Sequence, residues 1–168
     1  ARLCKAFDMR VLVRDPYMPK GTIRGAGYAP VDDVPAALAQ ADIVTLHCPS
    51  NAETRNIADA AFIRAMKRGA VLVNTARGTL VDEAALDRAL REDHLGAAGL
   101  DVFEEEPVAT PIALLTAPNL ICTPHVAAST QEGLHRMAME SARAVLGFFE
   151  GWLDPDVVVN REVLQRND

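Results

Sequence analysis

A chain of 168 residues with 49% hydrophobic and 24% charged residues has the length of one folded domain and is too apolar for a disordered protein. Its formal net charge of −6 argues against a nucleic-acid-binding surface, which needs a basic face, but does not exclude a local positive pocket for a small anion. Aromatic residues make up only 5%, which favours helices packed on a sheet over an aromatic-rich β-sandwich.

The cysteines are Cys4, Cys48 and Cys122, an odd and scattered set without CxxC spacing. Such a set indicates neither a disulfide framework nor a zinc site, so we expect reduced, mostly buried thiols and a cytoplasmic protein. No apolar run reaches the length of a membrane span and no signal peptide opens the chain, so we predict no membrane partner. No closely spaced Asp, Glu and His residues indicate a metal site. The first residue is Ala1 rather than Met, which suggests that the chain starts inside a longer one.

The N-terminal part of the chain alternates a short helix with a strand. Apolar residues at helical spacing predict a helix over residues 1–7, and an apolar run predicts a strand over 10–14. This strand ends at Asp15 and Pro16, because a proline cannot donate to the ladder. A carboxylate at this place either binds the adenosine ribose of a dinucleotide or caps a turn, and both interpretations stay open. Residues 17–30 hold five prolines and glycines and are expected to form a loop.

Helices and strands then alternate down the chain, and acidic residues cap several of the helices. In chain order we predict a helix over 33–41 capped by Asp32 or Asp33, a strand over 43–47, a turn at 53–56, a helix over 60–66 capped by Asp59, a strand over 70–73 buried on both faces, a helix over 84–91 capped by Asp82 and Glu83, a strand over 96–103, a helical piece at 112–115 and a strand over 119–125. Ser129 to Glu132 matches a capping box that opens a long helix to about Gly151, and residues 152–168 are expected to be an irregular tail. Alternation of this kind builds an α/β fold, a doubly wound parallel sheet with right-handed crossovers.

Three of the predicted strand ends carry a charged or ionisable residue beside a proline or glycine: Arg77, Glu106 and His125. The carboxyl ends of parallel strands lie on one edge of the sheet, so we expect the three side chains to converge. Arginine binds a carboxylate through two N–H groups, histidine gives or takes a proton near neutral pH, and a glutamate beside the histidine favours its charged form. Together they indicate binding of a 2-oxo or 2-hydroxy acid and transfer of one proton at its oxygen.

Each of these residues also has a simpler interpretation. Arg77 is then a solvated loop arginine, Glu106 is one of three consecutive solvated acids, and His125 is a buried histidine bonded to a backbone carbonyl. His47 also lies at a strand end. It either lines a cleft for a cofactor or makes a structural hydrogen bond. Two further histidines are expected on the surface: His94 and His135.

Three motifs stand in order along almost the whole chain: Val73-Asn74-Thr75-Ala76-Arg77-Gly78, Leu100-Asp101-Val102-Phe103-Glu104-Glu105-Glu106-Pro107 and Thr123-Pro124-His125. They resemble the signatures of the D-isomer-specific 2-hydroxyacid dehydrogenases, a family that includes phosphoglycerate, glycerate, formate and D-lactate dehydrogenases. The resemblance implies a Rossmann-like NAD-binding domain. It also implies an NAD-dependent oxidoreductase that transfers a hydride between the nicotinamide and C2 of a D-2-hydroxy acid or 2-oxo acid, without indicating which acid.

The same resemblance assigns roles to individual residues. Arg77 falls on the arginine that binds the substrate carboxylate, Glu106 on the glutamate that orients the histidine, and His125 on the acid/base histidine. Asp15 falls on the ribose-binding acid, which implies NAD rather than NADP, since a carboxylate repels a 2′-phosphate. Arg77 and His125 are implied to contact the cofactor as well. The other positions implied to contact it are Pro16, His47, Cys48, Pro49, Thr54, Thr75, Ala76, Asp101, Ala127 and Ala128.

The sequence departs from the family pattern chiefly in having no G-x-G-x-x-G phosphate loop. This loop, its strand and the substrate-binding half are expected upstream of Ala1. Residues 1–151 therefore resemble the C-terminal part of a dinucleotide-binding domain, and 152–168 a tail that returns to the missing domain. Without the helix N-terminus that holds the pyrophosphate, we expect the chain alone to bind NAD weakly and to be inactive. Smaller departures are Thr79 in place of a second glycine and two alanines, at 127 and 128, in place of Gly-Gly.

A second class of protein, the NAD(H)-sensing C-terminal-binding-protein corepressors, shares this fold and residues equivalent to Arg77, Glu106 and His125. Residues 44–48 and 117–125 are similar to theirs as well. Those corepressors tend to carry a tryptophan soon after the histidine, whereas the only tryptophan here is Trp152. The resemblance therefore favours the enzyme. It also implies a homodimer, because family members usually pair through this domain.

Overall fold

The computed structural model describes residues 1–108 and 111–165, and the chain divides into two units, Ala1–His125 and Val126–Asp168. The domain boundary expected at residue 151 stays a prediction. Within the described residues, no helix is both long and apolar enough to cross a membrane. The same residues contain no group of three potential metal ligands.

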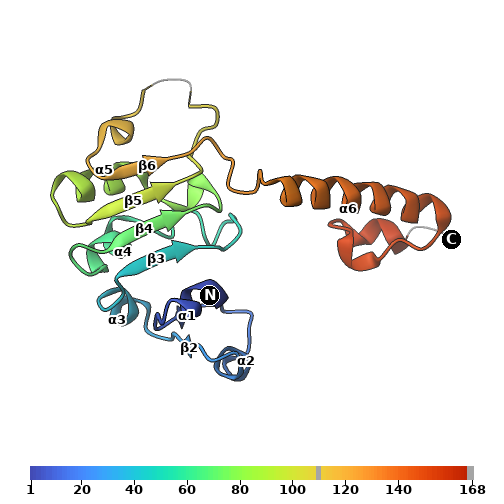
Figure 1. Cartoon of the computed structure of the whole chain (residues 1–168), viewed down its shortest axis with the longest axis horizontal. Helices are drawn as coiled ribbons and strands as arrows, with labels where there is room; N and C mark the ends of the chain where they lie inside the picture. The colour runs from blue at the N-terminus through green and yellow to red at the C-terminus, as the bar shows by residue number, and fades with distance from the viewer. Residues whose placement is uncertain (109–110, 166–168) are drawn as a thin grey trace. The chain divides into compact units, whose positions relative to one another are not determined.

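The larger sheet of the first unit holds four parallel strands in the order β3 (Ile43–Leu46), β4 (Val71–Asn74), β5 (Ala97–Leu100) and β6 (Leu120–Cys122). Figure 1 shows these four strands side by side. The register pairs Leu46 with Asn74, Asn74 with Leu100 and Leu100 with Cys122. The carboxyl ends of all four strands therefore lie on one edge, and the predicted parallel α/β fold is confirmed.

The N-terminal segment forms a separate two-stranded parallel sheet from β1 (Leu12–Val13) and β2 (Ala29–Pro30). The helices of this segment are α1 (Arg2–Ala6), α2 (Lys20–Gly25) and α3 (Val34–Leu38). The prediction of a loop over 17–30 was wrong, because this stretch contains both α2 and β2. Pro19 is the N-cap of α2, and Ile23 is buried at 3% exposure. Burial of Ile23 outweighs the weak helix propensity of the glycines that suggested a loop.

One face of the larger sheet packs on α4 (Ala60–Ala65) and α5 (Glu83–Arg91). In β4 and β5 buried residues alternate with half-exposed ones, so β4 buries Leu72 and Asn74 but not Val71 or Val73. The prediction that this strand is buried on both faces was therefore wrong. The predicted helix caps are confirmed for Asp59 and Asp82, whose side chains accept the N–H groups of Phe62 and Ala85. The core joins both helices to the sheet through Ile63, Leu72, Leu86, Leu90, Ala98 and Leu100.

Two short 3₁₀ helices complete the first unit, η1 (Gly78–Leu80) and η2 (Ala113–Thr116). Arg91 at the end of α5 donates to the Ala113 carbonyl and the Thr116 hydroxyl, each at 2.9 Å, and so fixes η2. The cysteines are free, as expected, but they are not mostly buried. Cys4 and Cys48 are half-buried and Cys122 is exposed.

The second unit consists of the long helix α6 (Gln131–Glu150) and two 3₁₀ helices, η3 (Pro155–Val157) and η4 (Arg161–Gln165). Thr130 rather than Ser129 caps α6, because its hydroxyl accepts the Gly133 N–H at 3.0 Å. The predicted end at Gly151 is confirmed by its left-handed φ of 76°.

The tail after α6 was predicted to be irregular, with residues 157–159 able to pack; it contains two short 3₁₀ helices, and Val157 and Val158 do pack against α6. A Cβ on Gly147 would lie 2.9 Å from the Trp152 ring, so the absence of a side chain lets the tail approach. Leu153, Val157 and Val158 line an apolar pocket of about 300 Å³ with Phe148 and Phe149 of α6.

Candidate functional site

The turn after β4 presents Arg77 at the carboxyl edge of the sheet. Asn74 is fully buried, donates to the Arg77 carbonyl at 2.8 Å and accepts the Ala76 N–H at 3.1 Å, so one side chain closes the turn. The Arg77 side chain is exposed and donates one bond, at 2.6 Å, to the Ala76 carbonyl. Within the described residues no carboxylate pairs with its guanidinium. Its other N–H groups are therefore able to bind an external carboxylate.

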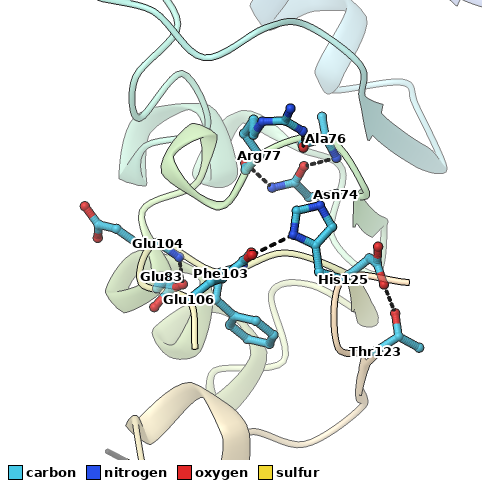
Figure 2. Close-up of polar contacts among 10 residues, drawn as sticks. Asn74, Ala76, Arg77, Glu83, Phe103, Glu104, Glu106, Thr123 and His125 are labelled. Carbon is cyan, nitrogen blue, oxygen red and sulfur yellow. Dashed lines mark hydrogen bonds and ion pairs between the residues drawn. The ribbon is translucent and has the colours of Figure 1, made fainter. Parts of the chain in front are cut away.

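Glu106 and His125 are joined by a hydrogen bond of 2.6 Å between Oε2 and Nδ1, as the sequence predicts (Figure 2). The other oxygen of Glu106 accepts the Phe103 N–H at 2.8 Å. The Phe103 N–H, and next the His125 imidazole, hold the pKa of the Glu106 carboxyl below its usual value. The side chains are 34% and 51% exposed, so a small substrate can reach the pair.

The backbone at His125 is held in the left-handed region, with a φ of 53°. Its N–H donates to the Asp101 carbonyl at 2.8 Å, and the Thr123 hydroxyl donates to the Asp101 carboxylate. Asp101 is only 3% exposed. A left-handed residue other than glycine costs about 1–3 kcal/mol and persists only where its surroundings hold it. The bonds to Asp101 supply that restraint, so the ends of β5 and β6 together fix the direction of the imidazole.

Three further segments contact the loop that carries Glu106 and fix its position. Glu83, at the start of α5, accepts the Glu104 N–H at 2.7 Å, and Arg55 pairs with the Glu104 carboxylate at 2.7 Å. Gly78 packs directly under this loop, because a Cβ there would lie 1.8 Å from the Phe103 carbonyl carbon. Figure 2 shows Arg77, Glu106 and His125 around this loop. The contact at Gly78 thus ties the segment of Arg77 to the segment of Glu106.

Three of the residues implied to bind the cofactor make local bonds. One Asp15 oxygen, Oδ1, accepts the N–H groups of Tyr17 and Met18 at 2.9 and 3.2 Å, so the turn-cap interpretation is confirmed, while Oδ2 has no partner within residues 1–108 and 111–165. His47 bonds the Thr45 hydroxyl at 3.0 Å, in agreement with the second interpretation of this residue, a structural hydrogen bond. The Thr54 hydroxyl donates to the Pro49 carbonyl at 2.6 Å. A role of these residues toward a cofactor stays a prediction.

The other implied cofactor positions divide between the two units. Thr75 and Ala76 follow β4, and Cys48 follows β3, so all three lie at the carboxyl edge. Pro16 and Pro49 are exposed in loops after β1 and β3. Two alanines, at 127 and 128, belong to the second unit. Among the histidines outside the site, His135 is exposed as predicted, but His94 is half-buried and its Nε2 bonds the Ile63 carbonyl at 3.0 Å.

Sequence reasoning missed three residues that hold the site together. Asn74 carries a recognisable signal, since an asparagine between a strand and a turn commonly bonds the backbone of the turn. Gly78 carries a weaker one, because a glycine also occurs wherever a loop is flexible. Glu83 carries none, since its partner lies 21 positions away in the chain.

Comparison with known proteins identifies the family. Residues 1–127 match the family model described as D-isomer specific 2-hydroxyacid dehydrogenase, NAD binding domain. The glyoxylate reductase of Aeropyrum pernix is 39% identical over 167 residues, which are 98% of this chain and 49% of that protein. The D-3-phosphoglycerate dehydrogenase of Methanocaldococcus jannaschii is 43% identical over 154 residues, which are 92% of this chain and 29% of that protein.

A solved structure of a dehydrogenase has the same fold as this chain. The D-lactate dehydrogenase of Aquifex aeolicus, solved with NAD and lactic acid, superposes with a TM-score of 0.78 at 30% identity, over 90% of this chain and 48% of that one. The chain thus spans about half or less of the length of these relatives. The match over residues 1–127 and the shared fold together place the chain in the family of D-isomer-specific 2-hydroxyacid dehydrogenases, as part of their NAD-binding domain.

Proposed function

We propose that this chain is the C-terminal part of a longer NAD-dependent dehydrogenase that interconverts a D-2-hydroxy acid and its 2-oxo acid. The observation that carries the proposal is the bond of 2.6 Å between His125 Nδ1 and Glu106 Oε2. A carboxylate on one ring nitrogen leaves the other nitrogen to exchange a proton with a substrate. A solvated histidine with a purely structural role does not need this arrangement.

In the direction of reduction, His125 donates a proton from Nε2 to the oxygen on C2 of the acid. Nε2 has no hydrogen-bond partner within the described residues, so it is open to a substrate. Glu106 stabilises the imidazolium, and the lowered pKa of its carboxyl keeps it ionised at neutral pH. In the direction of oxidation, the neutral His125 accepts the proton of the hydroxyl group.

Arg77 binds the carboxylate of the acid through its guanidinium N–H groups. The structure supports this role because the side chain is exposed and no described carboxylate pairs with it. Two parallel N–H···O bonds fix the orientation of the acid as well as its position. Asn74 sets the direction of Arg77 by closing the turn on which it stands.

Residues that follow β4 fit the nicotinamide end of a dinucleotide, and Asp15, which follows β1, fits its ribose. Thr75 and Ala76 are small, and Asp15 keeps Oδ2 for a ribose hydroxyl, which favours NAD over NADP. NADH supplies the hydride when it is bound. The 168 residues hold no G-x-G-x-x-G turn for the pyrophosphate, so we propose that the chain alone binds NADH only weakly and is inactive.

The proposal is tested with the longer protein that contains this chain, by following NADH oxidation with a panel of 2-oxo acids such as glyoxylate, pyruvate and hydroxypyruvate. We expect turnover with at least one small 2-oxo acid. NADH binding without turnover of any member of the panel contradicts the enzyme and favours the corepressor alternative. Fluorescence titration of the isolated 168 residues with NADH tests the weak binding, and micromolar affinity contradicts it.

We also propose a homodimer in the cytoplasm. Apolar side chains on the second unit support the dimer, since Leu146, Phe148, Phe149 and Trp152 are each more than half exposed. Three free thiols support the reducing compartment. Light scattering on the eluting peak of a gel-filtration column tests the dimer, and a monomer mass at micromolar concentration contradicts it.

A further inference from the structure

A polar pocket of about 160 Å³ lies between α4 and α5. The end of α4 leads through Gly69 to the amino end of β4, and the end of α5 leads through His94 to the amino end of β5. Arg77 follows the carboxyl end of β4. The pocket therefore lies in the groove between the two helices, and Arg68, Glu92 and His94, which follow the helices, lie toward the edge of the sheet opposite Arg77.

Three arginines line this pocket: Arg64 in the last turn of α4, Arg68 in the turn that follows α4, and Arg88 in the last turn of α5. Within the described part of the chain, none of the three has an ion pair or a side-chain hydrogen bond. Arg91, one turn further along α5, contrasts with them, because it pairs with Asp87 at 2.9 Å. The guanidinium groups of the pocket thus retain their donors for a ligand.

The charge of the pocket has the opposite sign to that of the chain. With three arginines and Glu92, the lining carries a formal charge of +2 when His94 is neutral, whereas the chain carries −6. Glu92 lies one helical turn after Arg88, yet no ion pair of 4.0 Å or less joins them. A local positive field in an acidic protein concentrates small anions at that place.

The wall of the pocket is held in place. His94 is half-buried, and its Nε2 bonds the Ile63 carbonyl at 3.0 Å, so Nε2 carries the ring proton. The His94 carbonyl accepts the Gly69 N–H at 2.8 Å. Buried Ile63 and Ala89 from the two helices pack beneath. The arginines therefore stand on a fixed base, and they supply the N–H donors of the pocket.

We propose that the pocket between α4 and α5 is a binding site for a small dianion, an inorganic phosphate or the phosphate group of a small phosphate ester. Two negative charges match the formal charge of the lining, and the planar fork of arginine binds phosphate oxygens through two parallel bonds. The pocket volume suits an anion of this size and excludes a dinucleotide. This site is independent of NAD and of the dehydrogenase reaction.

The test is an NMR titration of the 168-residue chain with phosphate at neutral pH, with chloride adjusted to keep the ionic strength constant. We expect saturable shifts of the Nε–H signals of Arg64, Arg68 and Arg88. Acetate, a monoanion, should give much weaker shifts. Linear shifts without saturation, or equal shifts with acetate, overturn the proposal. A phosphate ester such as glycerol 3-phosphate serves as a second probe, and tighter binding than phosphate identifies the ester as the preferred source.

Two variants locate the binding. Arg88→Gln and Arg64→Gln should each weaken phosphate binding about tenfold, since each removes a charged donor. Arg136→Gln is the matched control, because Arg136 is an exposed arginine on α6 without an ion pair among the described residues, and it should leave the affinity unchanged. Both pocket arginines are exposed, so both variants should fold. Affinity equal to that of the control in both pocket variants contradicts the site.

Discussion

Substitution of Gly78 should disturb the site most, because its contact with Phe103 joins the segment of Arg77 to the loop of Glu106. In Gly78→Ala, the new Cβ would lie 1.8 Å from the Phe103 carbonyl carbon and 2.4 Å from the Glu104 nitrogen. Both neighbours are backbone atoms and cannot rotate away. Ordinary contact begins at 3.4 Å, so the loop and Gly78 must separate by about 1.5 Å.

The expected cost follows from this displacement. Overpacking of a closely packed site costs about 1–3 kcal/mol, and we expect the upper end because backbone must move. With a urea dependence of about 2 kcal/mol/M, the midpoint of unfolding falls by about 1.5 M. Movement of Phe103 also weakens its bond to Glu106, so the pKa of the Glu106 carboxyl should rise toward its usual value.

Urea unfolding and NMR titration of 13C-labelled glutamate measure the two effects on the 168-residue chain. Gly99→Ala is the matched control, because Gly99 lies in β5 and a Cβ there meets nothing within 4 Å. This control should be neutral or slightly stabilising, since alanine lowers the entropy of the unfolded chain. An unfolding midpoint of Gly78→Ala equal to that of the control, with an unchanged titration of Glu106, refutes the reasoning.

Three further predictions concern the same edge of the sheet. Asn74→Ala should lower the free energy of unfolding by about 2–3 kcal/mol, because it removes two bonds from a fully buried side chain, and urea unfolding that shows less than 1 kcal/mol contradicts it. The folded pKa of Glu106 lies below the unfolded value of about 4.5, so its ionised form stabilises the fold above that pH and the benefit disappears as the pH falls through the folded pKa. The difference in urea unfolding between Glu106→Gln and wild type should thus be present at pH 6 and shrink as the pH falls below about 4.5, and a difference independent of pH speaks against the assignment. Arg77→Lys in the longer protein should lower kcat/KM for the acid by about 30- to 100-fold while NADH binding stays unchanged, because lysine lacks the planar fork, and steady-state kinetics that show less than a threefold change argue against carboxylate binding.

The elements that sequence reasoning predicted correctly are those with a continuous apolar run or a local cap. Strands β3 to β6 alternate with α4 and α5, and the carboxylates of Asp59 and Asp82 stand directly before the helices they cap. Helix α2 escaped prediction because its only buried residue is Ile23 and glycines stand at both of its ends. The cap of α6 depended on which of two adjacent hydroxyls reaches Gly133, a choice that geometry decides.

The candidate site divides in the same way. The approach of Glu106 to His125 followed from parallel strands ending on one edge, which is a property of topology rather than of local sequence. The contacts that hold the site in place could not be predicted from the topology. Gly78 against Phe103 and Glu83 against Glu104 are contacts between distant segments, and no pattern in either segment indicates its partner.

The most direct test of the proposed function is the substitution His125→Asn in the longer protein, with kcat and NADH affinity measured side by side. We predict that kcat falls by about 10²- to 10⁴-fold, the usual contribution of a general acid or base, while the affinity for NADH changes little. His135→Asn, on the exposed surface of α6, is the matched control and should keep full activity. Turnover of His125→Asn within a few-fold of wild type contradicts the assignment of His125 as the proton donor.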